Sequence, residues 1–236
     1  IHNHAVSDLL EPGSVFKTAS IMTALDDGVV DTNYQVNTGS GVWPMYGREM
    51  KDHNWRRGGY GVLTLPQTLM VSSNIGVSRI IDDHYRNDPE KFIRGIYRTG
   101  LADNLRIPLV GASPARIRMP KKNERGEWVN WSHTALPWMS IGYETQVPPI
   151  STLTFYNAIA NNGKMMRPRF VKEVVKNGEV IMEFPPEVMR AHICKEKTLR
   201  EIQTILDHVV SQGLGKKAGS PSFRVAGKTG TAQMSK

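Results

Sequence analysis

A serine and a lysine lie three residues apart at the start of a predicted helix, directly after a proline-glycine turn. The segment is Glu11–Lys17, and apolar residues at close to helical spacing continue the helix to about Asp26. Gly28 follows as the expected C-cap. Residues three apart share one face of a helix, so the Ser14 hydroxyl and the Lys17 amine are expected to meet.

A serine paired with a lysine in this way can act as an activated nucleophile. A serine hydroxyl is weakly nucleophilic unless a neighbouring base takes its proton, and a neutral amine can do so. The start of a helix also presents free N–H groups and the positive end of its dipole to developing negative charge. However, a four-residue pattern arises easily by chance, and Ser14 would then be an ordinary N-cap.

Two later segments support the catalytic interpretation. Ser72 and Asn74 form an S-x-N pattern at a predicted connection between two helices. Lys228, Thr229 and Gly230 form a K-T-G pattern after a β-prone segment. S-x-x-K, S-x-N and K-T-G in this order are the signature set of penicillin-binding proteins and related serine β-lactamases.

The sequence therefore resembles the transpeptidase domain of penicillin-binding proteins. The segments Glu-Pro-Gly-Ser-x-Phe-Lys, Ser-Ser-Asn-Ile-Gly and Ala-Gly-Lys-Thr-Gly-Thr-Ala-Gln are similar to those of the class B, monofunctional branch. The stretch from Ile141–Glu144 through Thr154–Gly163 resembles the division-specific, FtsI-like group. The resemblance covers nearly the whole chain. It implies an α+β fold like that of serine β-lactamases, with a helical subdomain and an antiparallel sheet that is incomplete in this chain.

The resemblance also implies a role for each catalytic residue. Ser14 attacks the carbonyl carbon of the penultimate D-alanine of a pentapeptide stem, and Lys17 is the general base. Ser72 relays the proton to the leaving D-alanine, while Asn74 orients Lys17 and the substrate amide. Lys228 supplies positive potential near Ser72 and helps to bind the substrate carboxylate.

The residues after Lys228 are expected to bind substrate. By resemblance, the hydroxyls of Thr229 and Thr231 bind the substrate carboxylate, and Gly230 lets the substrate backbone approach closely. The backbone N–H groups of Ser14 and Thr231 form the oxyanion hole. No metal or organic cofactor is required, and the sequence itself offers only a weak H-x-H pair, His2 and His4, as metal ligands.

Composition limits the other classes of function. The 236 residues, 39% of them hydrophobic, suit one large domain, residues 1–236, which the resemblance makes a partial transpeptidase domain. The net charge is +8, but the basic residues are scattered and no nucleic-acid motif accompanies them, so no nucleic-acid partner is expected. The single cysteine, Cys194, forbids an internal disulfide. A P-loop is also excluded, because Ser222 stands where that motif needs glycine.

The expected setting follows from the resemblance. Partners are peptidoglycan pentapeptide stems, β-lactam antibiotics and division-machinery proteins. Members of the family begin with a membrane anchor and a pedestal and continue past K-T-G, so the chain is expected to be a fragment of a membrane-anchored protein. That protein would lie in the bacterial cell envelope, at the cytoplasmic membrane, with its catalytic domain facing the periplasm or the extracellular side.

Two alternative functions share the expected fold. A class A β-lactamase deacylates with a glutamate and a water, and the family carries that glutamate in a Glu-x-x-Leu-Asn segment. No such segment lies between Asn74 and Lys228, since Glu144 is followed by Thr-Gln-Val-Pro. A penicillin sensor, acylated without turnover, is the alternative that is not an enzyme. Sensors of the class D type usually have valine at the position of Asn74, so Asn74 favours the transpeptidase.

Local patterns predict most of the elements. Helices are expected over residues 14–26, 63–71, 75–84, 88–98, 151–161 and 197–210, with a hairpin turn at Lys176-Asn177-Gly178 and irregular structure over 29–60 and 106–138.

A strand is expected over residues 223–233. Its one sheet neighbour in the resembled fold would come from sequence after Lys236. We therefore expect this strand to pair with another copy, or to leave its position so that the cleft is not properly formed.

Overall fold

Helices form most of the fold. The computed structural model describes residues 2–231. Within these residues the helices are α1 (His4–Ser7), α2 (Lys17–Asp26), α3 (Leu65–Met70), α4 (Asn74–Tyr85), α5 (Pro89–Arg98), α6 (Ala135–Ser140), α7 (Pro149–Ala160) and α8 (Glu196–Ser211). Three short 3-10 helices are η1 (Gly13–Phe16), η2 (Trp55–Arg57) and η3 (Lys216–Ala218). The six helices predicted from the sequence are confirmed, whereas α6 begins inside a segment that was expected to be irregular.

The strands form small antiparallel pairs. They are β1 (Gln35–Asn37), β2 (Val42–Met45), β3 (Arg48–Lys51), β4 (Val62–Thr64), β5 (Met165–Met166), β6 (Glu173–Lys176), β7 (Glu179–Glu183) and β8 (Val188–Arg190). Within residues 2–231 the pairs are β1–β4, β2–β3, β5–β8 and β6–β7. Helices with small antiparallel sheets confirm the predicted α+β class.

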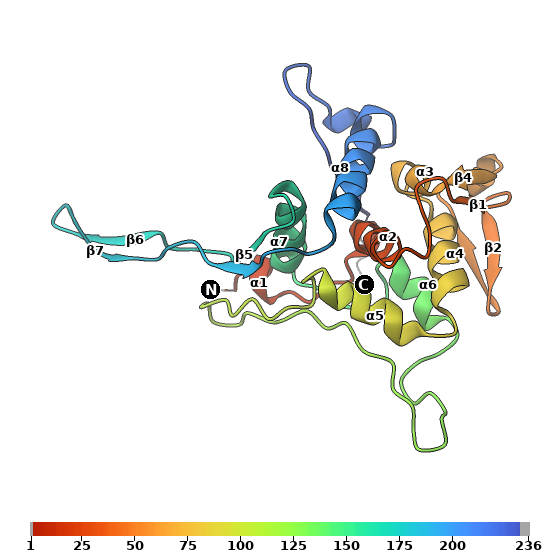
Figure 1. The fold of residues 1–236 in the computed structure, drawn as a ribbon, viewed down its shortest axis with the longest axis horizontal. Helices are drawn as coiled ribbons and strands as arrows, with labels where there is room; N and C mark the ends of the chain where they lie inside the picture. The colour runs from red at the N-terminus through yellow and green to blue at the C-terminus, as the bar shows by residue number, and fades with distance from the viewer. Residues whose placement is uncertain (1, 232–236) are drawn as a thin grey trace.

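Helix α2 lies at the centre of the helical part. Helices α4, α5 and α8 pack against it (Figure 1). Every residue from Lys17 to Ala24 is buried, including polar ones. Two of the buried hydroxyls are paired: the Ser20 hydroxyl donates to the Ser140 carbonyl at 2.7 Å, and the Thr18 hydroxyl lies 2.8 Å from the Tyr156 hydroxyl, whereas the Thr23 hydroxyl oxygen has no partner among the described residues. The helix that carries the S-x-x-K lysine is thus held on all sides.

Side-chain caps define the starts of the two helices that flank Ser72. Thr64 and Gln67 form a capping box at the start of α3. Ser73 caps α4, with its hydroxyl accepting from the Gly76 N–H at 2.8 Å. Between the two helices Ser72 has a left-handed backbone, with φ of 52°. A non-glycine residue in this region is uncommon and is typical of tight turns and functional sites.

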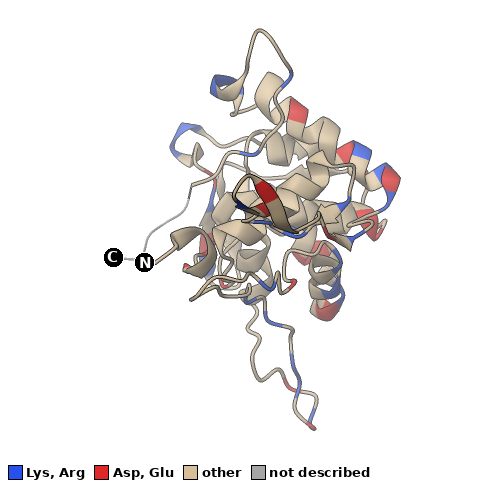
Figure 2. Cartoon of the chain, turned by 90° about the vertical axis from the view of Figure 1, so that its left-hand side faces the viewer, with Lys and Arg blue, Asp and Glu red and all other residues tan. Residues whose placement is uncertain are grey.

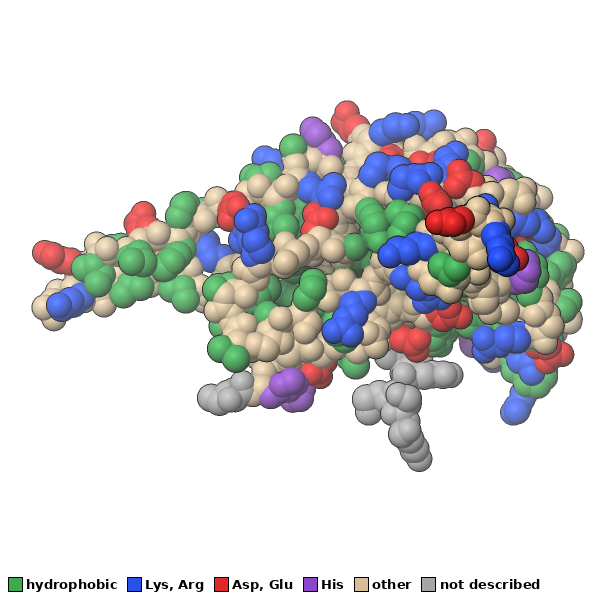
Figure 3. Space-filling model, turned by 90° about the horizontal axis from the view of Figure 1, so that it is seen from below, with side chains coloured by type: hydrophobic (Ala, Val, Ile, Leu, Met, Phe, Trp, Pro, Cys, Tyr) green, Lys and Arg blue, Asp and Glu red, His purple; other side chains and the backbone are tan. Residues whose placement is uncertain are grey.

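The β6–β7 hairpin projects from the body as an arm (Figure 1). Its turn is the predicted Asn177-Gly178 pair, in which both residues have positive φ, as a tight hairpin requires. Hydrophobic side chains gather on the arm (Figure 3), and Val175, Ile181 and Met182 are each more than half exposed.

Charge is dispersed rather than gathered. Basic and acidic residues are interspersed along the helices and loops in Figure 2. Within residues 2–231 no helix has both the length and the apolar composition needed to cross a bilayer.

The K-T-G segment differs from its prediction. Residues 223–231 form no strand, and residues 232 and 233 of the predicted strand lie outside the described residues. The Gly227 N–H donates to the Leu206 carbonyl of α8 at 3.1 Å, and Arg224 pairs with Asp207 of α8 at 2.9 Å. Because α8 holds the segment in place of a strand, Lys228 still reaches Ser72. The predicted strand does not form among residues 223–231, but Lys228 keeps its place beside Ser72, so the expected loss of the cleft is not observed; pairing with another copy stays a prediction.

Gly142 is expected to be irreplaceable. It has φ of 91°, and a Cβ there would lie 2.0 Å from the carbonyl oxygen of Gly13, directly before the S-x-x-K serine. Combined clash and backbone strain should lower the free energy of unfolding of Gly142→Ala by roughly 3–5 kcal/mol. Urea denaturation measures this. Gly178→Ala is the matched control, because its φ is also positive but a Cβ would meet nothing within 4 Å, so only about 1 kcal/mol of strain is expected. Similar losses in both variants would contradict the argument.

Candidate active site

A cleft of about 520 Å³ collects residues from distant parts of the chain. Six of the eight site residues predicted from the sequence line it, and the other two, Lys17 and Lys228, contact Ser72. The lining residues are Ser14, Lys51, Asp52, His53, Trp55, Ser72, Asn74, Tyr143, Leu214, Thr229, Gly230 and Thr231.

Ser72 is the centre of a hydrogen-bond chain. The Lys17 Nζ donates to the Ser72 carbonyl at 2.8 Å and to its Oγ at 3.1 Å. The Lys228 Nζ donates to the same Oγ at 2.9 Å and also to the backbone and side-chain oxygens of Thr229, at 2.9 and 3.1 Å. One hydroxyl therefore joins two amines that come from opposite ends of the sequence.

The two amines differ in electrostatics. Lys17 is fully buried, and this burial, together with the positive charge of Lys228, holds the pKa of the Lys17 amine well below 10.5; the nearby Asp52 carboxylate opposes the shift. Burial lowers the pKa of Lys228 to about 8. Near neutral pH, Lys228 therefore keeps its positive charge for most of the time, while Lys17 is the amine poised to accept a proton.

Ser14 lies half-buried in η1 and faces the cleft. The expected contact with Lys17 is not made: among residues 2–231 no hydrogen bond joins the Ser14 hydroxyl to the Lys17 amine, which is directed to Ser72 instead. The K-T-G segment passes close to η1, because a Cβ on Gly230 would lie 2.9 Å from the Cγ1 atom of Val15. The Tyr156 hydroxyl donates to the Val15 carbonyl at 2.8 Å and holds η1 from the other side.

Asn74 lines the cleft at the first turn of α4. Its Nδ2 donates to the Lys51 carbonyl at 2.9 Å, and among residues 2–231 it makes no hydrogen bond to Lys17. The amide therefore joins α4 to β3, and its expected role toward Lys17 stays a prediction.

Asp52 is a site residue that sequence reasoning missed. It is 1% exposed, and its two oxygens accept from the Ser73 hydroxyl at 2.7 Å and the Ile75 N–H at 3.0 Å. The carboxylate thus holds the start of α4 and the connection that presents Ser72. No local pattern marked it, because it lies in the irregular stretch 29–60. Tyr143, by contrast, lies inside a segment that the family resemblance had already singled out.

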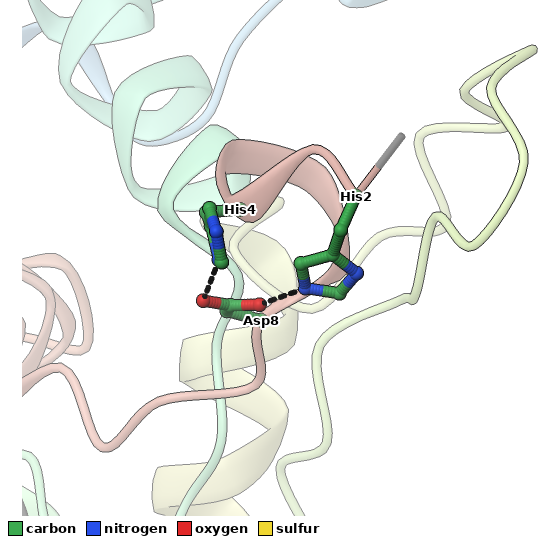
Figure 4. A group of neighbouring side chains, drawn as sticks. All are labelled: His2, His4 and Asp8. Carbon is green, nitrogen blue, oxygen red and sulfur yellow. Dashed lines mark hydrogen bonds and ion pairs between the residues drawn. The ribbon is translucent and has the colours of Figure 1, made fainter.

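A separate cluster of metal-ligand types lies near the start of the chain (Figure 4). His2 and His4 contact the two carboxylate oxygens of Asp8 at 2.7 and 2.8 Å, and the three potential ligand atoms lie within 4.8 Å of one another. The sequence indicated the two histidines but not Asp8. Hydrogen bonding between imidazole and carboxylate accounts for this exposed arrangement, and none of the three residues lines the cleft.

Comparison with known proteins gives one consistent result. Residues 1–236 match the family described as the penicillin binding protein transpeptidase domain. The chain is 30% identical to the peptidoglycan D,D-transpeptidase FtsI of Escherichia coli strain K12, over 99% of this chain and 35% of that protein. Among solved structures, the transpeptidase domain of Burkholderia pseudomallei penicillin-binding protein 3 matches with a TM-score of 0.80 and 30% identity, over 99% of this chain and 64% of the other. The D,D-transpeptidase domain of a peptidoglycan glycosyltransferase from Eggerthella lenta matches with a TM-score of 0.84 and 26% identity, over 99% and 56%.

Replacing Lys17 by methionine should stabilise the fold. Because the pKa of Lys17 is lowered in the folded state, the unfolded chain binds more protons there near neutral pH, and folded wild-type protein gains stability as pH rises toward 10.5. Methionine removes this dependence, so Lys17→Met should gain about 1–2 kcal/mol at pH 7, with the gain shrinking at higher pH. Thermal denaturation from pH 7 to 10 measures both effects.

The control is Lys197→Met, which replaces an exposed lysine on α8 and should change stability little. Loss of stability in Lys17→Met at pH 7, or a gain that does not depend on pH, would contradict the electrostatic account.

Proposed function

Because the chain belongs to the family of penicillin-binding protein transpeptidase domains, we propose that the protein is a peptidoglycan D,D-transpeptidase acting through a serine acyl-enzyme. The observation that carries this proposal is the convergence of Lys17 and Lys228 on the Ser72 hydroxyl, beside a cleft that Ser14 lines. The names of the relatives are consistent with the same reaction.

The first step is acylation. Ser14 Oγ attacks the carbonyl carbon of the penultimate D-alanine, and its proton passes to the neutral amine of Lys17. The peptide C–N bond breaks, and the leaving D-alanine amine receives a proton from Ser72 Oγ, which regains one from Lys17. The observed bond between Lys17 and Ser72, at 3.1 Å, supports this path. The bond between Ser14 and Lys17 would form as substrate enters, since such bonds are often loose in free enzymes.

Substrate is held by the K-T-G segment. Lys228 keeps a positive charge near Ser72 and attracts the carboxylate of the terminal D-alanine, while the hydroxyls of Thr229 and Thr231 donate to it. Gly230 leaves the backbone open to the substrate. Ser14 and Thr231 line the same cleft, and their N–H groups would stabilise the oxyanion. Losing one such donor typically costs about 3–4 kcal/mol of transition-state stabilisation.

The second step transfers the acyl group. An amine of a second stem attacks the ester carbonyl, the Ser14 C–O bond breaks, and Ser14 recovers its proton as the cross-link forms. A β-lactam enters as a mimic of the acyl donor and leaves Ser14 blocked. Among the residues that line the cleft, the carboxylate is that of Asp52, and both its oxygens are already occupied. This favours a transpeptidase over a hydrolase that needs a free carboxylate to activate water.

The setting proposed for the protein is the bacterial cell envelope. Similarity to the peptidoglycan D,D-transpeptidase FtsI supports a place in peptidoglycan synthesis at the envelope. The family resemblance of the motifs adds the proposal of a membrane-anchored protein whose catalytic domain faces the periplasm or the extracellular side, with division-machinery proteins as partners. Its substrates would be peptidoglycan pentapeptide stems.

Labelling with a fluorescent penicillin tests the nucleophile. Wild-type protein should gain one covalent adduct by intact mass, and Ser14→Ala should gain none because Ser14 is the proposed nucleophile and Ser72 is the proposed proton relay between Lys17 and the leaving group. Lys17→Ala should label at least about a hundredfold more slowly, because a positioned base typically contributes this much. Ser211→Ala, which changes an exposed serine at the end of α8, should label normally. Persistent labelling of Ser14→Ala would contradict the assignment of Ser14 as the nucleophile.

The lifetime of the penicilloyl adduct distinguishes a transpeptidase from a β-lactamase. Asp52 is the acidic residue among the described residues that line the cleft, and its bonds to Ser73 and Ile75 occupy both oxygens, so it is not free to activate water at Ser14. The penicilloyl adduct should therefore persist for many minutes, and a chromogenic cephalosporin should be hydrolysed about once per protein molecule. Many turnovers would instead indicate a β-lactamase. A stable adduct without cross-linking of stem peptides in the full protein would indicate a penicillin sensor.

A further inference from the structure

A second pocket lies at the other end of α4 from the catalytic cleft. Its volume is about 320 Å³, which falls in the range of small-molecule sites. Aromatic rings and a few polar groups form its walls, which is the usual composition of such sites. The lining residues are Tyr46, Asp82, Arg86, Trp128, Trp131, Ser132, His133 and Leu136. None of them belongs to the K-T-G, S-x-N or S-x-x-K motifs.

The aromatic rings of this pocket are held in place. Tyr46 and His133 stack with their ring centres 5.7 Å apart and an angle of 23° between the rings. Trp131 packs against the hydrophobic core, and the Arg118 guanidinium lies 5.3 Å from its ring centre. Arg118 also donates to the Asn130 carbonyl at 3.0 Å, which ties the loop carrying Trp131 to the body. A pocket held in this way loses little conformational freedom when a ligand binds.

The polar side of the pocket has hydrogen-bonding capacity to spare. Asp82 is 5% exposed, and one of its oxygens accepts from the Tyr46 hydroxyl at 2.8 Å. Within residues 2–231 no second side chain donates to this carboxylate, so its other oxygen can accept from a ligand. The Arg86 guanidinium pairs with Asp83 at 2.9 Å and has further N–H groups to donate. The carboxylate of Asp82, an acceptor, and the guanidinium of Arg86, a donor, therefore line the same pocket as the aromatic rings.

We propose that this pocket binds a sugar unit of the glycan strand that carries the stem peptide; this rests on the proposed function. One face of a pyranose ring presents C–H groups, which pack against aromatic rings such as Trp128 and Trp131. The hydroxyl and N-acetyl groups at its edge hydrogen-bond to carboxylate and guanidinium, here Asp82 and Arg86. A purely apolar ligand would leave the second oxygen of Asp82 and the remaining N–H groups of Arg86 without hydrogen-bond partners.

The distance between pocket and cleft suits the length of a stem peptide. Asn74, in the cleft, and Asp82, in the pocket, are eight residues apart on α4, which corresponds to about 12 Å along the helix axis. The β2–β3 hairpin bridges the same two points, since Lys51 contacts Asn74 and Tyr46 contacts Asp82. The acyl part of a pentapeptide stem has four residues and spans about 13–14 Å when extended. The spacing between the Asn74 and Asp82 positions is therefore within the length of the acyl part of a stem, whose attached sugar would then lie at the pocket.

Calorimetric titration of the full chain with the peptidoglycan disaccharide, N-acetylglucosamine linked to N-acetylmuramic acid, tests the proposal. Wild-type protein should bind it. Trp128→Ala and His133→Ala should each weaken binding about tenfold by removing an aromatic wall. His133 is exposed, so its loss should not affect folding, which circular dichroism verifies. Trp43→Ala is the matched control: it removes a ring that stacks on Arg79 outside the pocket and should bind as wild type does.

The outcomes distinguish this proposal from the proposed function. Absence of binding to wild-type protein, or equal affinity in Trp128→Ala, His133→Ala and Trp43→Ala, would overturn the sugar site. Penicillin labelling of Ser14 in the same sample reports separately on the transpeptidase chemistry. Disaccharide binding that is lost in the two pocket variants would support the sugar site even if Ser14 failed to label.

Discussion

The buried amine of Lys17 is the constraint on which the site depends. An amine taken out of water loses hydration, and its charged form loses most, so the group tends toward neutrality. Ser72 compensates by accepting from the amine through its carbonyl and its hydroxyl. These bonds join the central helix α2 to the α3–α4 connection. The same burial that opposes stability leaves the amine unprotonated, and so able to accept a proton, near neutral pH. Active sites commonly combine lower stability with higher reactivity in this way.

The rest of the helical part keeps Ser72 where this amine can reach it. Ser72 lies between two capped helices: Thr64 and Gln67 cap the start of α3, and Ser73, held by Asp52, caps the start of α4. The Ser72 N–H donates to the Leu69 carbonyl at 3.2 Å and the Ser73 N–H donates to the Thr68 carbonyl at 2.8 Å, which holds the turn between the helices. Each cap pairs polar groups that a helix end would otherwise leave unsatisfied. Because α4 starts in the cleft and ends at the aromatic pocket, one rigid helix also sets the spacing between the two sites.

The third motif reaches the site without a sheet among the described residues. Segment 223–231 is held by α8 through the Leu206 carbonyl and Asp207, and Lys228 then bonds to Ser72. Close contact between Gly230 and Val15 brings the segment against the helix of the nucleophile. The position of Lys228 therefore depends on α8, so its charge beside Lys17 is a product of packing rather than of strand pairing.

Local sequence signals determined much of this protein. Helical periodicity, the capping residue Thr64 and the Asn177-Gly178 turn indicate where most of the helices and turns lie. Three short motifs indicate the family and the chemistry. These signals act within a few residues, where backbone geometry leaves few choices. Tertiary structure alone decided that Lys17 bonds to Ser72 rather than Ser14, that Asp52 supports the cleft, and that α8 replaces a strand neighbour for residues 223–231. It also decided that Tyr46, Asp82 and Trp131 form one pocket. Such contacts join residues far apart in the chain, and their geometry follows from packing of the whole core, which no local pattern encodes.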